Sequence, residues 1–167
     1  MMVFLKALRD LHPTHIAVCF DAPGKTFRDD LYENYKATRA KKPQELYDQI
    51  PIIQEFLTAF GIRFFQVKGV EADDVIGTLA RKAEKQGYET IIATGDLDAL
   101  QLVDDHTKVY TLRKGISDTV VYDRGAVHTR YGGLSPEQLV DFKSLRGDPS
   151  DNIPGVQGIG EKTASEI

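Results

Sequence analysis

The stretch Ile91-Ile-Ala-Thr-Gly-Asp-Leu-Asp98 joins a short apolar run to two acidic residues. A run of β-branched and small apolar residues that ends at glycine is typical of a buried strand in a parallel sheet. We therefore predict a strand from Glu89 to Thr94 and a short helix at about residues 97–102. Asp96 and Asp98 would then lie just beyond the carboxyl end of the strand, where open α/β sheets bind their ligands.

The same order, a strand followed by acidic residues, recurs on the N-terminal side. Thr14 to Phe20 is predicted to be a buried strand, and Asp21 comes directly after it. A second strand is predicted from Ile62 to Val67, followed by Glu71-Ala-Asp73-Asp74 and a helix from Ala72 to Gln86. Strands that alternate with helices indicate an α/β fold with a mainly parallel sheet flanked by helices. All these acids would share one edge of that sheet.

The other elements are predicted from the same periodicities. A helix is expected from Val3 to Leu11, and Pro51 is expected to kink or break a second helix. From Leu134 onward the pattern changes to a helix, a turn, a glycine-rich hairpin and a helix start, so we divide the chain into residues 1–133 and 134–167. The second helix has apolar residues at Leu46, Ile50, Ile53, Leu57 and Phe60, and a β-hairpin around Gly115 would join Lys108–Leu112 to Thr119–Tyr122.

Composition limits the class of protein. The chain has 167 residues, of which 41% are hydrophobic and 28% charged, as expected of a chain with a packed core. No apolar run is long enough to cross a bilayer, and a cytoplasmic location with no membrane partner is expected. The single cysteine, Cys19, lies in an apolar run and is read as a buried, reduced thiol. The four histidines show no ligand spacing.

Acidic residues form the main functional signal. Three acids in four residues at Glu71–Asp74 exceed what helix capping needs, although capping explains one or two of them. Carboxylates that converge in one site repel each other unless divalent cations offset their charge, and two such cations beside a phosphodiester are typical of a nuclease. Asp96-Leu-Asp98 also resembles the motif of haloacid-dehalogenase-like phosphatases, but Leu100 stands where that motif has Thr or Val. The eight acids are Asp21, Glu71, Asp73, Asp74, Asp96, Asp98, Asp148 and Asp151.

Basic and aromatic residues gather between residues 24 and 42. Although the whole chain has a net charge of −4, residues 25–42 carry six bases and three acids, a net +3. With no clear apolar face, residues 24–42 could be an exposed loop or a mobile helical segment. In a helix, Lys36 and Arg39, three residues apart, would share one face and could bind a phosphate, while Tyr35 or Phe27 offers a stacking surface. An exposed basic helix without a ligand is the plain alternative. Gly24-Lys25-Thr26 is a poor nucleotide-binding loop because Cys19 stands where the pattern requires glycine.

A third motif, Gly155-Val-Gln-Gly-Ile-Gly-Glu-Lys-Thr163, is predicted to be a hairpin that opens a helix. Glycines let backbone N–H groups approach a phosphate at a helix N-terminus. A turn between two helices also uses glycine, but three glycines in six residues beside Lys162 favour the phosphate reading.

Together these strings resemble the 5′-nuclease family, the 5′–3′ exonuclease and flap endonuclease domain at the N-terminus of bacterial DNA polymerase I. They follow the family order from Thr14 to Thr163. The strings are Phe20-Asp-Ala-Pro-Gly-Lys-Thr-Phe-Arg28, Tyr35-Lys-Ala-Thr-Arg39, Glu71-Ala-Asp-Asp74, Thr94-Gly-Asp-Leu-Asp98 and Gly147-Asp-Pro-Ser-Asp-Asn-Ile-Pro-Gly-Val-Gln-Gly-Ile-Gly160.

The resemblance implies a PIN-like nuclease core with a helical arch at about residues 24–42, and a helix–three-turn–helix DNA-binding element at 134–167. It implies two Mg²⁺ or Mn²⁺ ions, with Asp21, Glu71 and Asp73 on the first and the other five acids on the second, and K⁺ at the hairpin. Lys36 and Arg39 would contact the scissile phosphate. The substrate would be DNA with a 5′ end or flap, in replication and repair. DNA contacts are expected from Lys25, Arg28, Tyr35, Gly155, Gly158, Gly160, Lys162 and Thr163.

The chain departs from the family pattern in three places. The family begins with a strand whose Asp is a metal ligand, whereas this chain starts at the helix that follows that strand. The family also continues beyond the position of Ile167, and Leu97 stands where the family usually has Lys. We therefore expect a fragment with weak or no activity, normally fused to a polymerase. One alternative is a DNA-binding module that has lost turnover. Another, an RNA-cleaving PIN toxin, is disfavoured because such a domain has no use for the Gly155–Gly160 hairpin.

Overall fold

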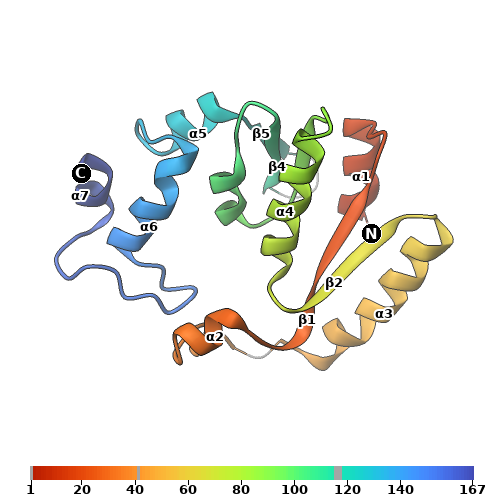
Figure 1. Ribbon diagram of the computed structural model, residues 1–167, viewed down its shortest axis with the longest axis horizontal. Coiled ribbons are helices and arrows are strands. Elements are labelled where there is room, and N and C mark those ends of the chain that lie inside the picture. The colour runs from red at the N-terminus through yellow and green to blue at the C-terminus, as the bar shows by residue number, and fades with distance from the viewer. Residues whose placement is uncertain (1, 41, 115–117) are drawn as a thin grey trace.

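The computed structural model describes residues 2–40, 42–114 and 118–167 and contains two small sheets surrounded by helices (Figure 1). Figure 1 shows α6 and α7 at one end of the molecule and α3 at the other. Within the described ranges, no helix is both long and apolar enough to span a membrane. The strands are β1 (Ala17–Thr26), β2 (Arg63–Gly69), β3 (Thr90–Ala93), β4 (Thr107–Lys114) and β5 (Asp118–Tyr122). The helices are α1 (Met2–Leu11), α2 (Phe27–Leu31), α3 (Gln44–Ala59), α4 (Ala72–Glu84), η1 (Leu97–Leu102), α5 (Arg124–Arg130), η2 (Pro136–Gln138), α6 (Leu139–Arg146) and α7 (Glu161–Glu166).

The predicted mainly parallel pairing is confirmed, but the strands form two sheets. β1 pairs with β2 in parallel, β3 pairs with β4 in parallel, and β5 is antiparallel to β4. Helix α4 packs against strands of both sheets. The expectation that β1 is buried is wrong, since its residues are half-buried or exposed. The reason is that, in the described part of the chain, β1 has β2 as its sole strand neighbour.

The hydrophobic core lies on the β3–β4–β5 sheet. Its buried residues include Ile92 and Val109 from the strands and Ala99, Leu100 and Val103 from η1 and the residue after it. The apolar side chains of η1 therefore pack against the β3–β4–β5 sheet and hold η1 on it. The core therefore fixes the turn that carries Asp96 and Asp98.

Substitution of Leu100 is a direct test of that anchoring. The side chain is 0% exposed. We expect Leu100→Ala to lower the free energy of unfolding by about 3 kcal/mol, because it removes buried methyl groups and leaves a cavity. Urea unfolding measures the loss. Leu31→Ala is the matched control, since Leu31 is 79% exposed; equal losses in the two variants would contradict the assignment of Leu100 to the core.

Helix α4, the 97–102 helix and the β4–β5 hairpin agree with the sequence prediction, although the turn at Gly115 lies outside the described residues. Helix α5 was not predicted. Asp123 is its N-cap, and the Asp123 carboxylate accepts a hydrogen bond from the Ala126 N–H at 2.8 Å. An Asp that precedes a short run of helix-compatible residues is a capping signal that could have located this helix.

Helix α3 differs from its prediction in two respects. It runs through Pro51 as one helix of 16 residues, so of the expected kink or break the break is absent. Proline leaves the carbonyl of Tyr47 without its helical donor, and Tyr47 is 49% exposed, so water can satisfy that carbonyl. The predicted apolar face is buried at Leu57, whereas Phe60 is 63% exposed.

Candidate metal centre and nucleic-acid interface

The N-terminus of α4 carries three of the predicted acids, and they have different partners. Glu71 is the N-cap, and the Asp74 carboxylate accepts a hydrogen bond from the Glu71 N–H at 2.9 Å. The Arg28 guanidinium donates two further hydrogen bonds to Asp74, at 2.6 and 2.8 Å. These bonds hold the pKa of Asp74 below its ordinary value, chiefly through Arg28. Asp74 is thus satisfied by protein donors, and Arg28 is paired within the chain.

Asp73 lies among other acids. Burial of its carboxyl raises the pKa of Asp73, and the negative charges of Asp96, Asp21 and Glu71 raise it further. The residue as a whole stays exposed. Four acids from three segments therefore share one region. A raised pKa for a clustered carboxyl is the expected result of like charges held close together.

Asp21 and Asp96 reach this region from the two sheets. Asp21 was expected after its strand, but it lies within β1, opposite Val67 and just before a shift in register. Its Oδ1 accepts a hydrogen bond from the Ala72 N–H at 2.8 Å. Asp96 caps η1 by accepting a hydrogen bond from the Asp98 N–H at 2.9 Å. These contacts tie Asp21 to the first residue of α4 and Asp96 to η1.

Asp98, Asp148 and Asp151 form a second group. Each offers a carboxylate oxygen, and the three oxygens lie within 4.8 Å of one another. Oxygen donors at this separation fit a hard divalent cation such as Mg²⁺ or Mn²⁺, so the residues present suit the metal that the sequence implied. Burial pushes the pKa of Asp148 upward, but hydrogen bonds from Lys143 and Ser150 outweigh burial and lower it to about 2.

Residues Tyr32–Arg39, here the arch segment, join the two acid groups. Lys36 Nζ donates to Glu71 Oε1 at 2.7 Å, and Arg39 pairs with Asp151. Tyr35 Oη lies 3.2 Å from both Glu71 Oε2 and Asp151 Oδ2, so its hydroxyl can donate a hydrogen bond to an acceptor of either group. Bases and an aromatic ring from one segment therefore reach acids of both groups.

The predicted helical arch is wrong for most of its length. Residues 27–31 form α2, the strand β1 extends to Thr26, and turns follow α2. Lys36 has φ 55°, outside the right-handed helical region, so Lys36 and Arg39 do not share a helix face. A backbone hydrogen bond from the Lys36 N–H to the Asp151 carbonyl, at 3.0 Å, stabilises this turn. Local spacing could not reveal a contact with a residue so far along the chain.

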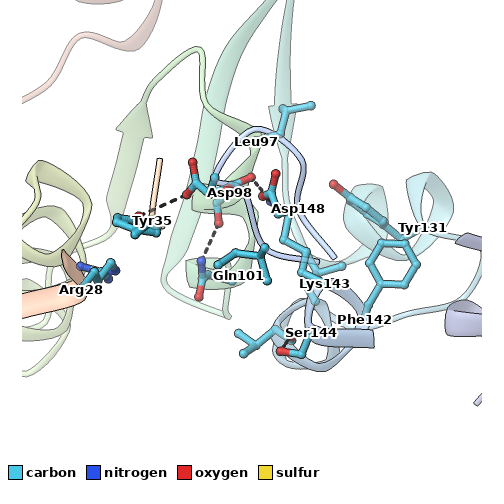
Figure 2. Close-up of a pocket in the computed structure, with 14 residues that line it drawn as sticks. Arg28, Tyr35, Leu97, Asp98, Gln101, Tyr131, Phe142, Lys143, Ser144 and Asp148 are labelled. Atoms are coloured by element: carbon cyan, nitrogen blue, oxygen red, sulfur yellow. Dashed lines mark hydrogen bonds and ion pairs between the residues drawn. The ribbon is translucent and has the colours of Figure 1, made fainter. Parts of the chain in front are cut away.

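Two pockets border these acids, and Tyr35 lines both of them. The larger, about 360 Å³, is shown in Figure 2, where Lys143 lies beside Asp98 and Asp148. The smaller, about 230 Å³, is lined by Asp21, Lys36, Arg39 and Glu71 among others. Tyr35 thus borders both pockets.

The glycine-rich hairpin has a structural role at one end and an open surface at the other. A Cβ on Gly155 would lie 2.4 Å from the Gly147 nitrogen, so the Gly155 position is required for backbone packing. The space around Gly158 and Gly160 is open. Lys162 and Thr163 are exposed at the start of α7, and Lys25 is exposed in β1.

Lys143 is the residue that sequence reasoning missed. It lies on α6 and contacts Asp98 and Asp148, the latter at 2.8 Å. Its position five residues before Asp148, near the end of a predicted helix, is the one local signal that could have drawn attention to it. Its contact with Asp98 depends on the tertiary fold.

Comparisons with known families and proteins find matches over nearly the whole chain. A family model described as "5′-3′ exonuclease, N-terminal resolvase-like domain" matches residues 1–132, and one described as "5′-3′ exonuclease, C-terminal SAM fold" matches residues 134–167. DNA polymerase I of Chloroflexus aurantiacus is 51% identical over 97% of this chain and 17% of its own length. DNA polymerase I of Bacillus subtilis is 49% identical over 99% of this chain and 19% of its own length. The chain thus spans about a fifth of these relatives.

Solved structures share the fold. T5 5′-exonuclease with bound divalent metal ions (zinc) has a TM-score of 0.78 and 22% identity, over 98% of this chain and 62% of the other. A T5 flap endonuclease in a pseudo-enzyme–product complex with DNA and metal ions has a TM-score of 0.76 and 21% identity, over 97% of this chain and 62% of the other. The fold is therefore the PIN-like 5′-nuclease fold that the sequence predicted.

Proposed function

Because the chain belongs to the 5′–3′ exonuclease family, we propose that it hydrolyses phosphodiester bonds of DNA at a 5′ end or a 5′ flap. The observation that carries the proposal is the contact of one basic, aromatic segment with acids of both groups: Lys36 with Glu71, and Arg39 with Asp151. Such a site can place a phosphate between cationic side chains and metal-binding carboxylates. In replication and repair, this activity would remove primers and flaps.

The carboxylates would hold Mg²⁺ or Mn²⁺. Asp21, Glu71 and Asp73 would serve one ion, and Asp98, Asp148 and Asp151 the other. We place Asp96 with the first ion rather than with the second, as the resemblance implied, because its charge acts on Asp73. When bound, two such ions lower the pKa of a water molecule and offset the charge on the leaving oxygen. Asp74 would act through Arg28 and the N-terminus of α4, since its oxygens already accept three hydrogen bonds from the protein.

Lys36 and Arg39 would bind the scissile phosphate after they leave the acids. A cation that pairs with a carboxylate before substrate arrives can exchange that partner for a phosphate oxygen, and its charge then offsets negative charge in the transition state. Tyr35, between the two pockets, would stack on a base next to the cleaved bond. This exchange makes binding dependent on salt, because phosphate contacts release counterions.

Residues 134–167 would bind the duplex next to the cut. Gly158, Gly160, Lys162 and Thr163 face open space or solvent at the start of α7, where backbone N–H groups can approach phosphates without reading sequence. Gly155 would support this surface through its packing rather than touch DNA.

A 5′-labelled flap oligonucleotide tests the proposal. With Mg²⁺ we expect cleavage near the junction, slow enough, given the weak activity expected from the sequence, to be followed under single-turnover conditions, and with EDTA no cleavage; a blunt duplex of the same sequence should be cut more slowly still. Product lengths on a denaturing gel measure both results. Binding of the flap without Mg²⁺-dependent cleavage would contradict the nuclease proposal and favour a DNA-binding module. Cleavage of single-stranded RNA in preference to the flap would contradict the choice of substrate.

A further inference from the structure

Lys143 occupies the space between two acids that come from different elements. Its ammonium contacts Asp98, which lies on η1, and Asp148, which follows α6. The side chain is 26% exposed, and the side chain of Asp148 is 13% exposed, so water screens this contact only in part. No role for Lys143 follows from the sequence motifs or from the proposed function.

The acids around Lys143 need a positive charge. Asp98, Asp148 and Asp151 place carboxylate oxygens within 4.8 Å of one another. Like charges at such distances repel strongly in a partly buried site. Arg39 pairs with Asp151, and Ser150 donates hydrogen bonds to Asp148 from its N–H at 3.0 Å and from its hydroxyl at 2.6 Å. The positive charge that reaches both Asp98 and Asp148 is that of Lys143.

The backbone holds Lys143 in this place. Its carbonyl accepts a hydrogen bond from the Gly147 N–H at 2.8 Å, which closes the last turn of α6. Asp148 then forms an isolated antiparallel bridge with Ile153. The ammonium therefore reaches from the last turn of α6 toward Asp148, whose backbone is bridged to Ile153, and toward Asp98 on η1.

We propose that Lys143 is a built-in counterion of this acid group: it holds Asp98 and Asp148 in position when no divalent cation is bound, and it yields to the cation when one binds. The inference rests on the proposed function in that it assumes a metal at this group. Lys143 is then a positioning residue with two opposed effects. It stabilises the metal-free fold, and it weakens divalent binding because the cation must overcome or displace its charge.

Mn²⁺ binding to the protein without DNA tests the proposal. The variants are Lys143→Met, Lys143→Gln and Lys143→Arg, with Lys82→Met as the matched control because Lys82 is an exposed lysine on α4. We expect the Met and Gln variants to bind one Mn²⁺ about tenfold more tightly than wild type, and the Arg variant and Lys82→Met to bind as wild type does. Electron paramagnetic resonance of free Mn²⁺ gives the dissociation constants.

Thermal unfolding supplies the second readout. In EDTA, Lys143→Met should melt at least about 3 °C below Lys82→Met, and saturating Mn²⁺ should close that gap. Unchanged or weaker Mn²⁺ affinity in a folded Lys143→Met or Lys143→Gln would overturn the proposal. If Lys143→Met does not fold in EDTA, Lys143→Gln, which keeps hydrogen-bond donors without the charge, decides the question.

Failure of this proposal is distinguishable from failure of the proposed function. Wild-type protein that binds Mn²⁺ but does not cut the flap would refute the nuclease activity and leave the expected effect of Lys143 on affinity intact. Normal flap cleavage with no effect of Lys143 on Mn²⁺ affinity would refute the counterion alone.

Discussion

Asp96→Asn is expected to reduce 5′-flap cleavage about a thousandfold while DNA binding is retained. Asp96 is within electrostatic reach of Asp73, whose pKa it raises, so it belongs to the acid group around the N-terminus of α4. Without one carboxylate, the site binds its divalent cation more weakly. The cation can then no longer offset the negative charge that develops at the phosphate. Single-turnover cleavage of the labelled flap measures the rate, and fluorescence anisotropy in Ca²⁺ measures binding.

Asparagine is chosen because it separates chemistry from structure. The Asp96 side chain accepts a hydrogen bond from the Asp98 N–H, and the Asn side-chain carbonyl oxygen can accept the same bond, so η1 should keep its cap. Asp105→Asn is the control, since the Asp105 side chain is 84% exposed. Full turnover of Asp96→Asn would rule out a catalytic function for this acid group. Equal losses in both variants would point to a general effect of net charge.

Gly155→Ala is expected to lower the free energy of unfolding by about 3 kcal/mol or more. Gly155 has φ +67°, and a Cβ there would lie 2.4 Å from the Gly147 nitrogen and 2.5 Å from the Arg146 carbonyl carbon. Both neighbours are backbone atoms at the end of α6, so a side-chain rotation cannot relieve the clash. The melting temperature should fall by about 10 °C, as measured by circular dichroism.

Gly160→Ala is the matched control in the same hairpin. Gly160 has φ −96°, and its added Cβ would meet no atom within 4 Å. We expect it to cost less than about 1 kcal/mol, mostly through weaker capping of α7. Because Gly155 holds the turn that carries Asp148 and Asp151, its substitution should also weaken Mn²⁺ binding. A Gly155→Ala variant as stable as Gly160→Ala would show that the hairpin relaxes without difficulty.

Apolar periodicity and residue spacing were sufficient to predict the elements that local contacts stabilise. Helix α4 and η1 formed where apolar residues recur at helical spacing and acidic residues cap the start. The family strings also identified the fold, since each is a continuous run of sequence. The same reasoning was wrong for Lys36 and Arg39, whose spacing suggested a helix but whose conformation is set by contacts with Glu71 and with residues 150–151.

The sequence by itself therefore determined which residues carry charge, which strands end beside acids, and to which family the chain belongs. Tertiary structure alone decided the partners: Arg28 with Asp74, Tyr35 between Glu71 and Asp151, and Lys143 between Asp98 and Asp148. The physical reason is the distance along the chain over which each interaction acts. Helix caps and apolar periodicity act over a few residues, whereas the energy of an ion pair depends on a distance in space that is set by the packing of whole elements.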